Sequence, residues 1–387
     1  MKKLAIITTH PIQYNAPLFK LLHARAQINI KVFYTWGEAV LEDKFDPGFG
    51  KIIKWDIPLL DGYEYEFVEN ISKKPGSHHF KGIDNPKLNQ QIKNWNADAV
   101  LIYGWSFKSH LKAMRFFKGI IPILFRGDSN LLQSKRIDKE IIRKLFLTWV
   151  YRYVDKALYV GTHNKEYYKS FGLAESQLVF APHAIENERF FKETESQTIE
   201  AINWRQKLNI KLNQIVFLYA GKLDENKNTE MLARVFSEHD LDGSQLVIVG
   251  NGKCEESLKN SFSKQKNINF LPFQNQKQMP EIYAMADVFV LPSLSETWGL
   301  SINEAMASGK AIIASDTCGA AIDLVKDGIN GYTFFSNNYN DLSEKIINIL
   351  NPLTDLKKMG NASLEIIKDW SYQNDCLAIE NILNTTF

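Results

Sequence analysis

The chain has 387 residues, of which 45% are hydrophobic and 23% charged, close to the composition of an average soluble protein. These values exclude a disordered chain, a fibrous protein and a disulfide-rich scaffold. The net charge of +2 conceals an uneven distribution, because residues 1–190 contain 28 Lys and Arg against 19 Asp and Glu, and the remainder contains 18 against 25. The basic half suits an anionic partner such as a lipid headgroup, a phosphate or a nucleic acid. The length exceeds what one hydrophobic core usually supports, so we expect two domains.

Short β-branched and aromatic runs alternate with longer amphipathic stretches, which is the pattern of βαβ units around a parallel sheet. In the first half, the expected strands are Leu4–Thr9, Ile30–Thr35, Ala99–Gly104, Ile121–Arg126, Ala157–Gly161 and Leu178–Pro182. In the second half, they are Ile215–Gly221, Leu246–Gly250, Ile268–Pro272, Val288–Pro292, Ala311–Ser315 and Tyr332–Phe335. The same alternation of strands and helices is therefore expected twice along the chain.

The segment Glu186–Glu200 between the two sets is polar and charge-rich, and it lacks apolar periodicity. We interpret it as a linker and predict an α/β fold of two Rossmann-like, doubly wound domains facing a central cleft. The expected boundaries are residues 1–186 for the first domain, 187–204 for the linker and 205–369 for the second domain. Ligands of such folds bind outside the carboxyl ends of the strands, so functional residues should lie in strand-to-helix loops.

The loop after the strand Ile215–Gly221 combines Gly221, Lys222 and Lys227 with a helical pattern that begins at Thr229. A diphosphate needs fixed positive charge and backbone donors, and a loop that enters a helix supplies both. The alternative is a solvated surface loop, because lysines are commonest on surfaces. The composition of the loop leaves both interpretations open.

Two further strand ends carry weaker signals. The turn Gly250-Asn251-Gly252 allows close backbone approach to a ligand, although many such turns only connect two elements. Pro272 and Phe273 could form one side of a binding site for a planar nucleotide base, although an apolar pair at a strand end is also typical of a hydrophobic core.

The segment Ser295–Glu304 follows the strand Val288–Pro292 and contains two glutamates, Glu296 and Glu304. If a helix starts near Gly299, its first N–H groups point outward beside Glu296, and Glu304 lies further along one face. Backbone amides could then hold a phosphate, and the carboxylates could accept hydrogen bonds from sugar hydroxyls. The alternative is an N-terminal helix charge with an exposed glutamate, and the spacing alone does not decide.

The segment Asn267–Phe334, with its two glutamates and its glycine at this spacing, closely resembles the donor-binding domain of the family-four glycosyltransferases, which adopt the GT-B fold. The lysine-containing loop resembles the family's basic diphosphate loop, with Lys222 where arginine is more usual. The turn at 250–252 is similar to the family's glycine turn. The resemblance is strong over about residues 205–370 and covers the first half in outline.

The resemblance implies donor-binding residues on four strand-to-helix loops. They are Gly221, Lys222, Lys227, Asn251, Pro272, Phe273, Glu296, Trp298, Gly299, Leu300, Ser301 and Glu304. Lys222 and Lys227 would neutralise the leaving diphosphate, and the amides around residues 299–301 would share that task. Glu304 would hold the ribose hydroxyls, and Glu296 the hydroxyls of the transferred sugar.

The resemblance also implies the reaction. The family retains the anomeric configuration and uses no metal motif, so we expect a metal-independent, retaining hexosyltransferase (EC 2.4) that needs no cofactor besides its nucleotide-diphosphate sugar. A UDP-sugar is the favoured donor and a GDP-sugar the next. Lys222, Lys227 and Glu296 are the catalytic candidates, and Trp298 stands where the family usually has phenylalanine. Residues 370–387 resemble the terminal helix that crosses back to the first domain in this fold.

The first domain departs from the family at two strand ends. A His10-Pro11 sequence stands in place of a glycine-rich loop after the first strand, and a segment with Arg126 and Asp128 stands in place of a histidine after the fourth. By the strand-end rule, His10, Arg126 and Asp128 are candidates for acceptor binding or proton handling. As alternatives, His10 caps a turn and Asp128 caps a helix.

Residues 135–152 interleave apolar and basic side chains. One hypothesis is an interfacial helix on an anionic membrane, which would bring the enzyme to a lipid-linked acceptor. The favoured alternative is an amphipathic helix packed on the sheet.

Cysteine usage and the apolar runs bear on location. Cys254, Cys318 and Cys376 lack metal-ligand spacing and cannot all pair, which favours a reducing compartment. The apolar run at residues 1–9 is too short for a signal peptide, and no stretch approaches the roughly 18 apolar residues of a membrane span. We therefore expect a cytoplasmic protein that meets a membrane only at its surface, at the inner face of the plasma membrane.

The leading functional hypothesis is sugar transfer to a saccharide or lipid-linked saccharide in surface glycan synthesis, with no nucleic acid as partner. A second reaction on the same fold would be that of a sugar-phosphate synthase or a nucleotide-sugar epimerase. A third hypothesis is a non-catalytic, nucleotide-sugar-binding partner subunit. Release of nucleoside diphosphate only when an acceptor is added would distinguish transfer from the other two.

Overall fold

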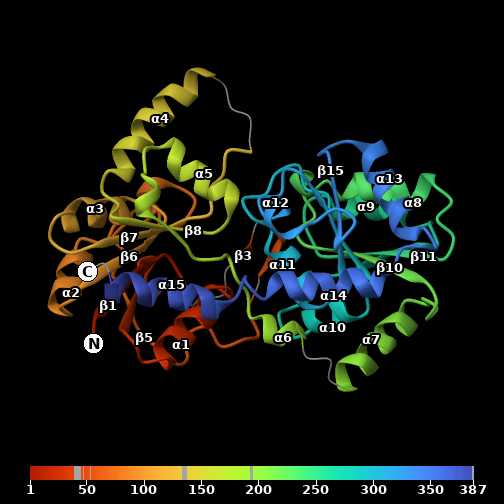
Figure 1. Cartoon of the computed structure of the whole chain (residues 1–387), viewed down its shortest axis with the longest axis horizontal. Helices are drawn as coiled ribbons and strands as arrows, with labels where there is room; N and C mark the ends of the chain where they lie inside the picture. The colour runs from red at the N-terminus through yellow and green to blue at the C-terminus, as the bar shows by residue number, and fades with distance from the viewer. Residues whose placement is uncertain (39–44, 47, 53, 133–136, 192–194, 386–387) are drawn as a thin grey trace. The chain divides into compact units, whose positions relative to one another are not determined.

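The computed structural model describes residues 1–38, 45–46, 48–52, 54–132, 137–191 and 195–385 (Figure 1). The chain divides into two compact units. The first unit comprises Met1–Lys44, Pro58–His183 and Tyr372–Phe387, and the second comprises Phe45–Ile57 and Ala184–Ser371.

The first unit contains a parallel sheet of seven strands in the order β5-β2-β1-β6-β7-β8-β9. The strands are β1 (Lys3–Thr8), β2 (Asn29–Tyr34), β5 (Glu64–Phe67), β6 (Ala99–Tyr103), β7 (Ile123–Arg126), β8 (Lys156–Tyr159) and β9 (Leu178–Phe180). The α-helices are α1 (Ala16–Ala24), α2 (Leu88–Asn94), α3 (Lys108–Phe117), α4 (Ile137–Tyr151), α5 (Thr162–Ser170) and α15 (Tyr372–Thr385), and the 3₁₀ turns are η2 (Phe80–Gly82) and η3 (Glu175–Gln177).

The second unit contains a parallel sheet of six strands in the order β12-β11-β10-β13-β14-β15. The strands are β10 (Ile215–Ala220), β11 (Ser244–Val249), β12 (Ile268–Leu271), β13 (Val288–Leu291), β14 (Ala311–Ser315) and β15 (Gly331–Phe334), and a hairpin adds β3 (Phe45–Asp46) and β4 (Lys51–Ile52). The helices are α6 (Asn187–Phe191), α7 (Glu195–Lys207), η4 (Glu225–Lys227), α8 (Thr229–Glu238), α9 (Glu255–Phe262), α10 (Met279–Ala284), α11 (Leu300–Ala307), α12 (Ala321–Leu324), α13 (Tyr339–Leu350) and α14 (Leu356–Ile367).

The strands are buried runs because helices cover both faces of each sheet. In the second unit, α8 and α13 lie on one side of the sheet and α10 and α14 on the other (Figure 1). Residues Leu4–Ile7 of β1 and Val288–Val290 of β13 have no exposed surface. Such continuous apolar runs in sequence are therefore the signature of a sheet that is covered on both faces. The predicted α/β class with two Rossmann-like units is confirmed by these two parallel sheets.

Each of the predicted strands overlaps an observed one, but the polar segments differ from expectation. The edge strand β5 has the sequence Glu64-Tyr65-Glu66-Phe67 and is half exposed, so no buried apolar run marks it. The segment interpreted as a linker forms the helices α6 and α7. In α7, Arg205 forms an ion pair with Asp287 at 2.8 Å and donates to the carbonyl oxygen of Met285 at 2.8 Å. These tertiary contacts stabilise a helix whose own hydrophobic periodicity is weak.

Two segments pack in a unit other than that of their sequence neighbours. The hairpin segment Phe45–Ile57 belongs to the second unit, although it lies within residues 1–186. The terminal helix α15 belongs to the first unit, where Arg25 of the α1 C-cap forms an ion pair with Glu380 at 2.7 Å. Within the described residues, no helix combines the length and the apolarity that a membrane span requires.

Candidate functional site

The strand order of the second unit changes direction between β10 and β13, and two predicted site loops follow these strands. The loops are joined by hydrogen bonds through Asn226, whose carbonyl oxygen accepts from the Leu294 amide and whose side chain donates to the Ser295 carbonyl, both at 2.7 Å. Crevices at such switch points are where α/β sheets bind ligands. These two hydrogen bonds therefore hold the loop after β10 against the loop after β13.

The central pair of these two loops is Lys227 and Glu296. The Lys227 ammonium contacts the Glu296 carboxylate, and the Ser293 hydroxyl donates to the same carboxylate oxygen at 3.2 Å. The side chains are 20% and 16% exposed, so both charges are partly shielded from water. In the same loop, the Asp224 carboxylate accepts a hydrogen bond from the Lys227 amide at 3.2 Å and so caps the η4 turn. The cap determines where the lysine side chain leaves the backbone.

The glycines of the site allow three strand ends to approach closely. A Cβ atom on Gly250 would lie 1.9 Å from the carbonyl oxygen of Gly221, and one on Gly252 would lie 2.3 Å from that of Leu223. The Asn251 side-chain oxygen accepts from the Phe273 amide at 2.9 Å, which joins the loop after β11 to the loop after β12. Only glycine permits the first two contacts, so the turn holds adjacent loops together.

The helix α11 begins where the motif predicts. Gly299 is its N-cap with a φ of 102°, a left-handed conformation that favours glycine, and the helix runs from Leu300 to Ala307. The amides of Leu300 and Ser301 therefore belong to the first turn, where backbone N–H groups have no intrahelical acceptor. A helix N-terminus with free amides favours an anionic group.

Two predicted donor residues on this segment are buried. Glu304 is 4% exposed and accepts a hydrogen bond from the Tyr283 hydroxyl at 2.8 Å. Trp298 is 2% exposed, and its indole N–H donates to the Asn303 side chain at 2.9 Å. The tryptophan thus stabilises the start of α11 from within the core.

In the first unit, the structure gives Arg126 a different environment from that of His10. Arg126 at the end of β7 is 5% exposed, donates to the carbonyl oxygens of Ala181 and Pro182, and forms an ion pair with Asp375 of α15 at 3.0 Å. Arg126 therefore joins β7 to the segment after β9 and to the terminal helix. Burial raises the pKa of Asp375 to about 6, while the charge of Arg126 lowers it.

His10 and Asp128 lie in the strand-to-helix loops after β1 and β7. The His10 Nδ1 atom is 2.8 Å from the Thr9 hydroxyl, and its ring meets the edge of Trp36 at a centroid distance of 5.2 Å. Asp128 raises the pKa of His183, which burial lowers to about 4. The predicted residues thus form two sets, one at the strand ends of each unit.

The sequence pattern did not single out Asn226, Ser293 or the segment 48–57. Asn226 and Ser293 could have been found by applying the strand-end rule to every polar residue of the two loops. Phe49 lies 4.9 Å from Phe273 between ring centroids, and Lys222 lies 4.9 Å from the centroid of the Phe49 ring. Hydrophobic periodicity is a local signal, so it does not indicate that Phe49 contacts Phe273, which lies far away in the sequence.

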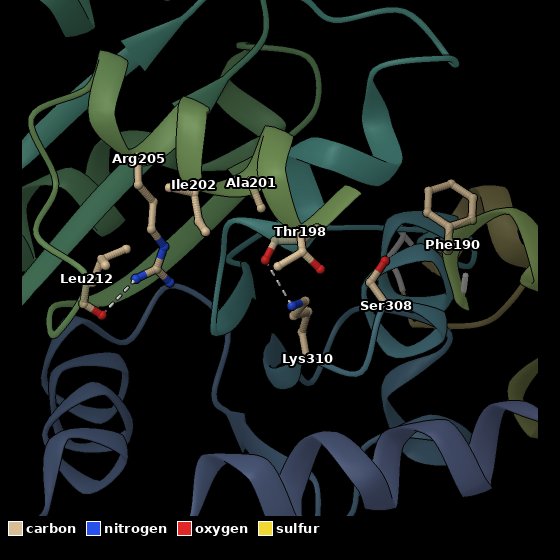
Figure 2. A pocket seen from close by; sticks show the side chains of 9 residues that line it. Phe190, Thr198, Ala201, Ile202, Arg205, Leu212, Ser308 and Lys310 are labelled. Carbon is tan, nitrogen blue, oxygen red and sulfur yellow. Dashed lines mark hydrogen bonds between the residues drawn. The ribbon is translucent and has the colours of Figure 1, made fainter. Parts of the chain in front are cut away.

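A separate pocket of about 310 Å³ lies beneath α7 in the second unit (Figure 2). Figure 2 shows Arg205 and Ile202 of α7 on one side and Ser308 and Lys310 on the other. Lys310 immediately precedes β14, so this pocket opens at the amino ends of the strands. The loops that contain the candidate site residues follow the carboxyl ends of the strands, and the pocket is therefore no part of the candidate site.

The chain is similar in sequence to known proteins over most of its second half. Residues 200–365 match the family described as glycosyl transferases group 1. The chain is 26% identical over 183 residues to an uncharacterized glycosyltransferase of Methanocaldococcus jannaschii, covering 45% of this chain and 46% of that protein. It is 32% identical over 159 residues to the UDP-Gal:alpha-D-GlcNAc-diphosphoundecaprenol alpha-1,3-galactosyltransferase of Escherichia coli, covering 40% of each. The chain thus spans less than half the length of these two curated relatives.

The fold of the whole chain is similar to the crystal structure of Anabaena HepE in complex with UDP. The TM-score is 0.73 at 16% identity, with all of both chains covered. At this identity the likeness concerns the fold, and it confirms the GT-B prediction.

Proposed function

We propose, on the premise that residues 200–365 belong to the glycosyl transferases group 1 family, that the protein transfers a sugar from a UDP-sugar to a saccharide or lipid-linked saccharide. The name of the E. coli relative specifies a UDP-linked donor and a diphosphoundecaprenol-linked acceptor. The similar HepE structure is a complex with UDP. These two proteins support the donor and acceptor classes, and surface glycan synthesis is the corresponding role.

The observation that carries the proposal is the Lys227–Glu296 pair beside the start of α11. A donor diphosphate can replace the glutamate as the partner of Lys227, with Lys222 and the amides of Leu300 and Ser301 nearby on the same edge. The released Glu296 carboxylate can then accept hydrogen bonds from hydroxyls of the sugar. Binding of the donor thus exchanges one ion pair for two sets of ligand contacts.

The proposed reaction is metal-independent and retains the anomeric configuration. The acceptor oxygen bonds to the anomeric carbon as the bond from that carbon to the diphosphate oxygen breaks. The acceptor proton passes to the departing phosphate, and the negative charge that develops there is stabilised by Lys222, Lys227 and the α11 amides. The protein supplies preorganised positive charge at the leaving group, and no covalent intermediate on a side chain is required.

The outer face of α4 supports a membrane-linked acceptor. Ile141, Ile142 and Leu145 are 62%, 72% and 70% exposed, whereas Leu147 and Val150 on the other face are buried. The helix therefore packs on the sheet through one face and presents apolar side chains on another. Lys144 borders this apolar surface and Arg152 follows the helix, whereas Arg143 packs over the Tyr167 and Phe171 rings on the other face. Apolar side chains among basic ones are the pattern of a helix that lies on an anionic bilayer.

The test of the reaction is acceptor-dependent release of UDP. Purified protein is incubated with a panel of UDP-sugars, with and without short-chain lipid-diphosphate saccharides or free saccharides. The proposal predicts UDP in stoichiometric amounts with the glycosylated product. Release without any acceptor would instead indicate a hydrolase or an epimerase-type side reaction. Binding without release in every combination would identify the non-catalytic alternative.

A further inference from the structure

The segment formed by residues 48–52 and 54–57, here called the strap, packs on the strand ends of the second unit. The Asn275 side chain donates to the carbonyl oxygen of Lys54 at 2.7 Å, and the Lys277 amide donates to the Asp56 carboxylate at 3.2 Å. At the other end of the strap, a Cβ atom on Gly48 would lie 2.4 Å from the Lys222 ammonium nitrogen. The strap therefore contacts the loops after both β10 and β12.

Three aromatic rings gather where the strap meets the loop after β12. Phe49 and Trp55 of the strap contact Phe273 edge-on, with centroid distances of 4.9 Å and 6.3 Å. Aromatic side chains provide faces on which nucleobases stack, regardless of the base. The Phe49 and Phe273 rings offer stacking area but have no hydrogen-bonding atom that distinguishes one base from another.

Lys51 is the polar group that the strap adds to this cluster. Its ammonium nitrogen lies 4.3 Å from the centroid of the Phe273 ring and donates to the Asn251 side-chain oxygen at 3.0 Å. Asn251 is itself fixed, because its oxygen also accepts from the Phe273 amide and its nitrogen donates to Glu255 at 2.7 Å. The ammonium is thus held at the junction of the loops after β11 and β12.

The position of Lys51 separates it from the phosphate-binding lysines. Lys222 follows β10, and Lys227 meets the loop after β13, whereas β12 lies two strands away from β10. Neighbouring strands are ~4.8 Å apart, so these strand ends are separated by about 10 Å. That separation is comparable with the distance between the base and the phosphates of a nucleotide. Phe49 contacts both ends, because its ring centroid is 4.9 Å from the Lys222 ammonium nitrogen and 4.9 Å from the Phe273 ring centroid. A diphosphate at Lys222 and Lys227 would place its base beside Phe273 and Lys51.

A lysine ammonium has three donors and no acceptor. It can donate to the carbonyl at position 4 of uracil or at position 6 of an oxopurine. It cannot accept from the amino group that cytosine and adenine carry at these positions. Burial lowers the pKa of Lys51, while the charge of Glu255 raises it, so the ammonium group is incompletely solvated. A missing hydrogen bond in such a site costs more than it does in water.

We propose that Lys51 selects the base of the nucleotide donor by donating a hydrogen bond to a carbonyl oxygen of uracil or of a 6-oxopurine. The inference rests on the proposed function, because it assigns the base end of the same donor site. The strap is then a part of the donor site and a specificity element, contributed by a segment that precedes the strands it contacts by more than 150 residues.

The test is calorimetric binding of four nucleotides that form two isosteric pairs. UDP and CDP differ at position 4 and in the hydrogen on the neighbouring N3, and inosine and adenosine diphosphates differ at position 6 and in the hydrogen on the neighbouring N1. The wild-type protein should bind at least one carbonyl-bearing member about tenfold or more tightly than its amino counterpart. Lys51→Met should bring that ratio close to one, and Lys51→Arg should preserve it. Lys54→Met, in an exposed lysine of the strap, is the matched control and should leave the ratio unchanged.

Three results would overturn the inference. An unchanged ratio in Lys51→Met, or tighter binding of the amino-bearing members by the wild type, would remove Lys51 from base selection. Tighter binding of all four nucleotides by Lys51→Met would show that the strap occupies the site. Failure of the folded wild type to bind any of the four would refute the donor function itself, which is distinguishable from binding without a Lys51 effect.

Discussion

Replacing Lys227 by methionine shows whether this lysine contributes mainly to catalysis or mainly to donor binding. In the free protein the ammonium already pairs with Glu296, and both side chains are largely buried. Donor binding would exchange one anionic partner for another, so the loss of Lys227 should weaken the donor Kd by about tenfold or less. In the transition state the departing diphosphate gains negative charge. Removal of one preorganised donor should then cost about 3 kcal/mol, or roughly a hundredfold in turnover.

The assay compares initial rates of UDP release at saturating donor with calorimetric donor affinity. Lys253→Met is the control, because Lys253 forms an exposed ion pair with Glu225 near the same loop. That surface pair should contribute less than about twofold to turnover. If Lys227→Met turns over at the wild-type rate, or if its loss appears only in KM, the assigned role is wrong.

A double-variant cycle shows whether Lys227 acts on the donor or only positions Glu296. If Lys227 acts on the diphosphate, the double variant Lys227→Met/Glu296→Gln should be slower than Glu296→Gln alone. If Lys227 merely orients the carboxylate, the double variant should be no slower than Glu296→Gln.

The other predictions concern stability and metal use. Gly250→Ala should destabilise the protein by about 2 kcal/mol more than Gly243→Ala in urea unfolding. Both glycines have positive φ, but an added Cβ atom would lie 1.9 Å from the Gly221 carbonyl oxygen at Gly250 and would meet no atom of the described residues within 4 Å at Gly243. Arg126→Met should lower the free energy of unfolding by about 3–5 kcal/mol, because the Asp375 carboxylate would remain buried without its cationic partner. Turnover per folded molecule should stay unchanged. A loss of turnover at full stability would show that Arg126 takes part in the reaction. Burial lowers the pKa of His110 to about 4, so as the pH drops the unfolded chain takes up this proton before the folded protein does. The free energy of unfolding should therefore fall between about pH 6.5 and pH 4, by about 2 kcal/mol at pH 5. His110→Gln should flatten this part of the pH profile. Treatment with a chelator should leave UDP release unchanged. If the chelator abolished UDP release and added Mg²⁺ or Mn²⁺ restored it, metal independence would be contradicted.

The strands and the start of α11 were accessible to sequence reasoning because their signals are local. A strand that is buried on both faces must be apolar throughout, as Val288–Val290 is, and Gly299 occupies a backbone conformation that favours glycine. The strand-end rule then placed Lys227 and Glu296 in strand-to-helix loops, and the structure brings them into contact.

The remaining features depend on contacts between distant residues. Arg126 was predicted from its place at a strand end, and nothing in the local sequence indicated that Asp375 would neutralise it. The helix α7 lacks a strong apolar face, and its ion pair with Asp287 becomes visible only in three dimensions. The strap has mixed polar and aromatic residues without periodicity, so its place beside Phe273 could not be inferred from pattern.

The most direct test of the central claim is to follow the reaction by proton NMR with UDP-α-sugars and the acceptor panel. The account predicts that UDP and a new glycoside appear together, with the α configuration retained at the anomeric carbon from the earliest time points. A product with inverted configuration, or no acceptor-dependent loss of any UDP-sugar, would contradict it.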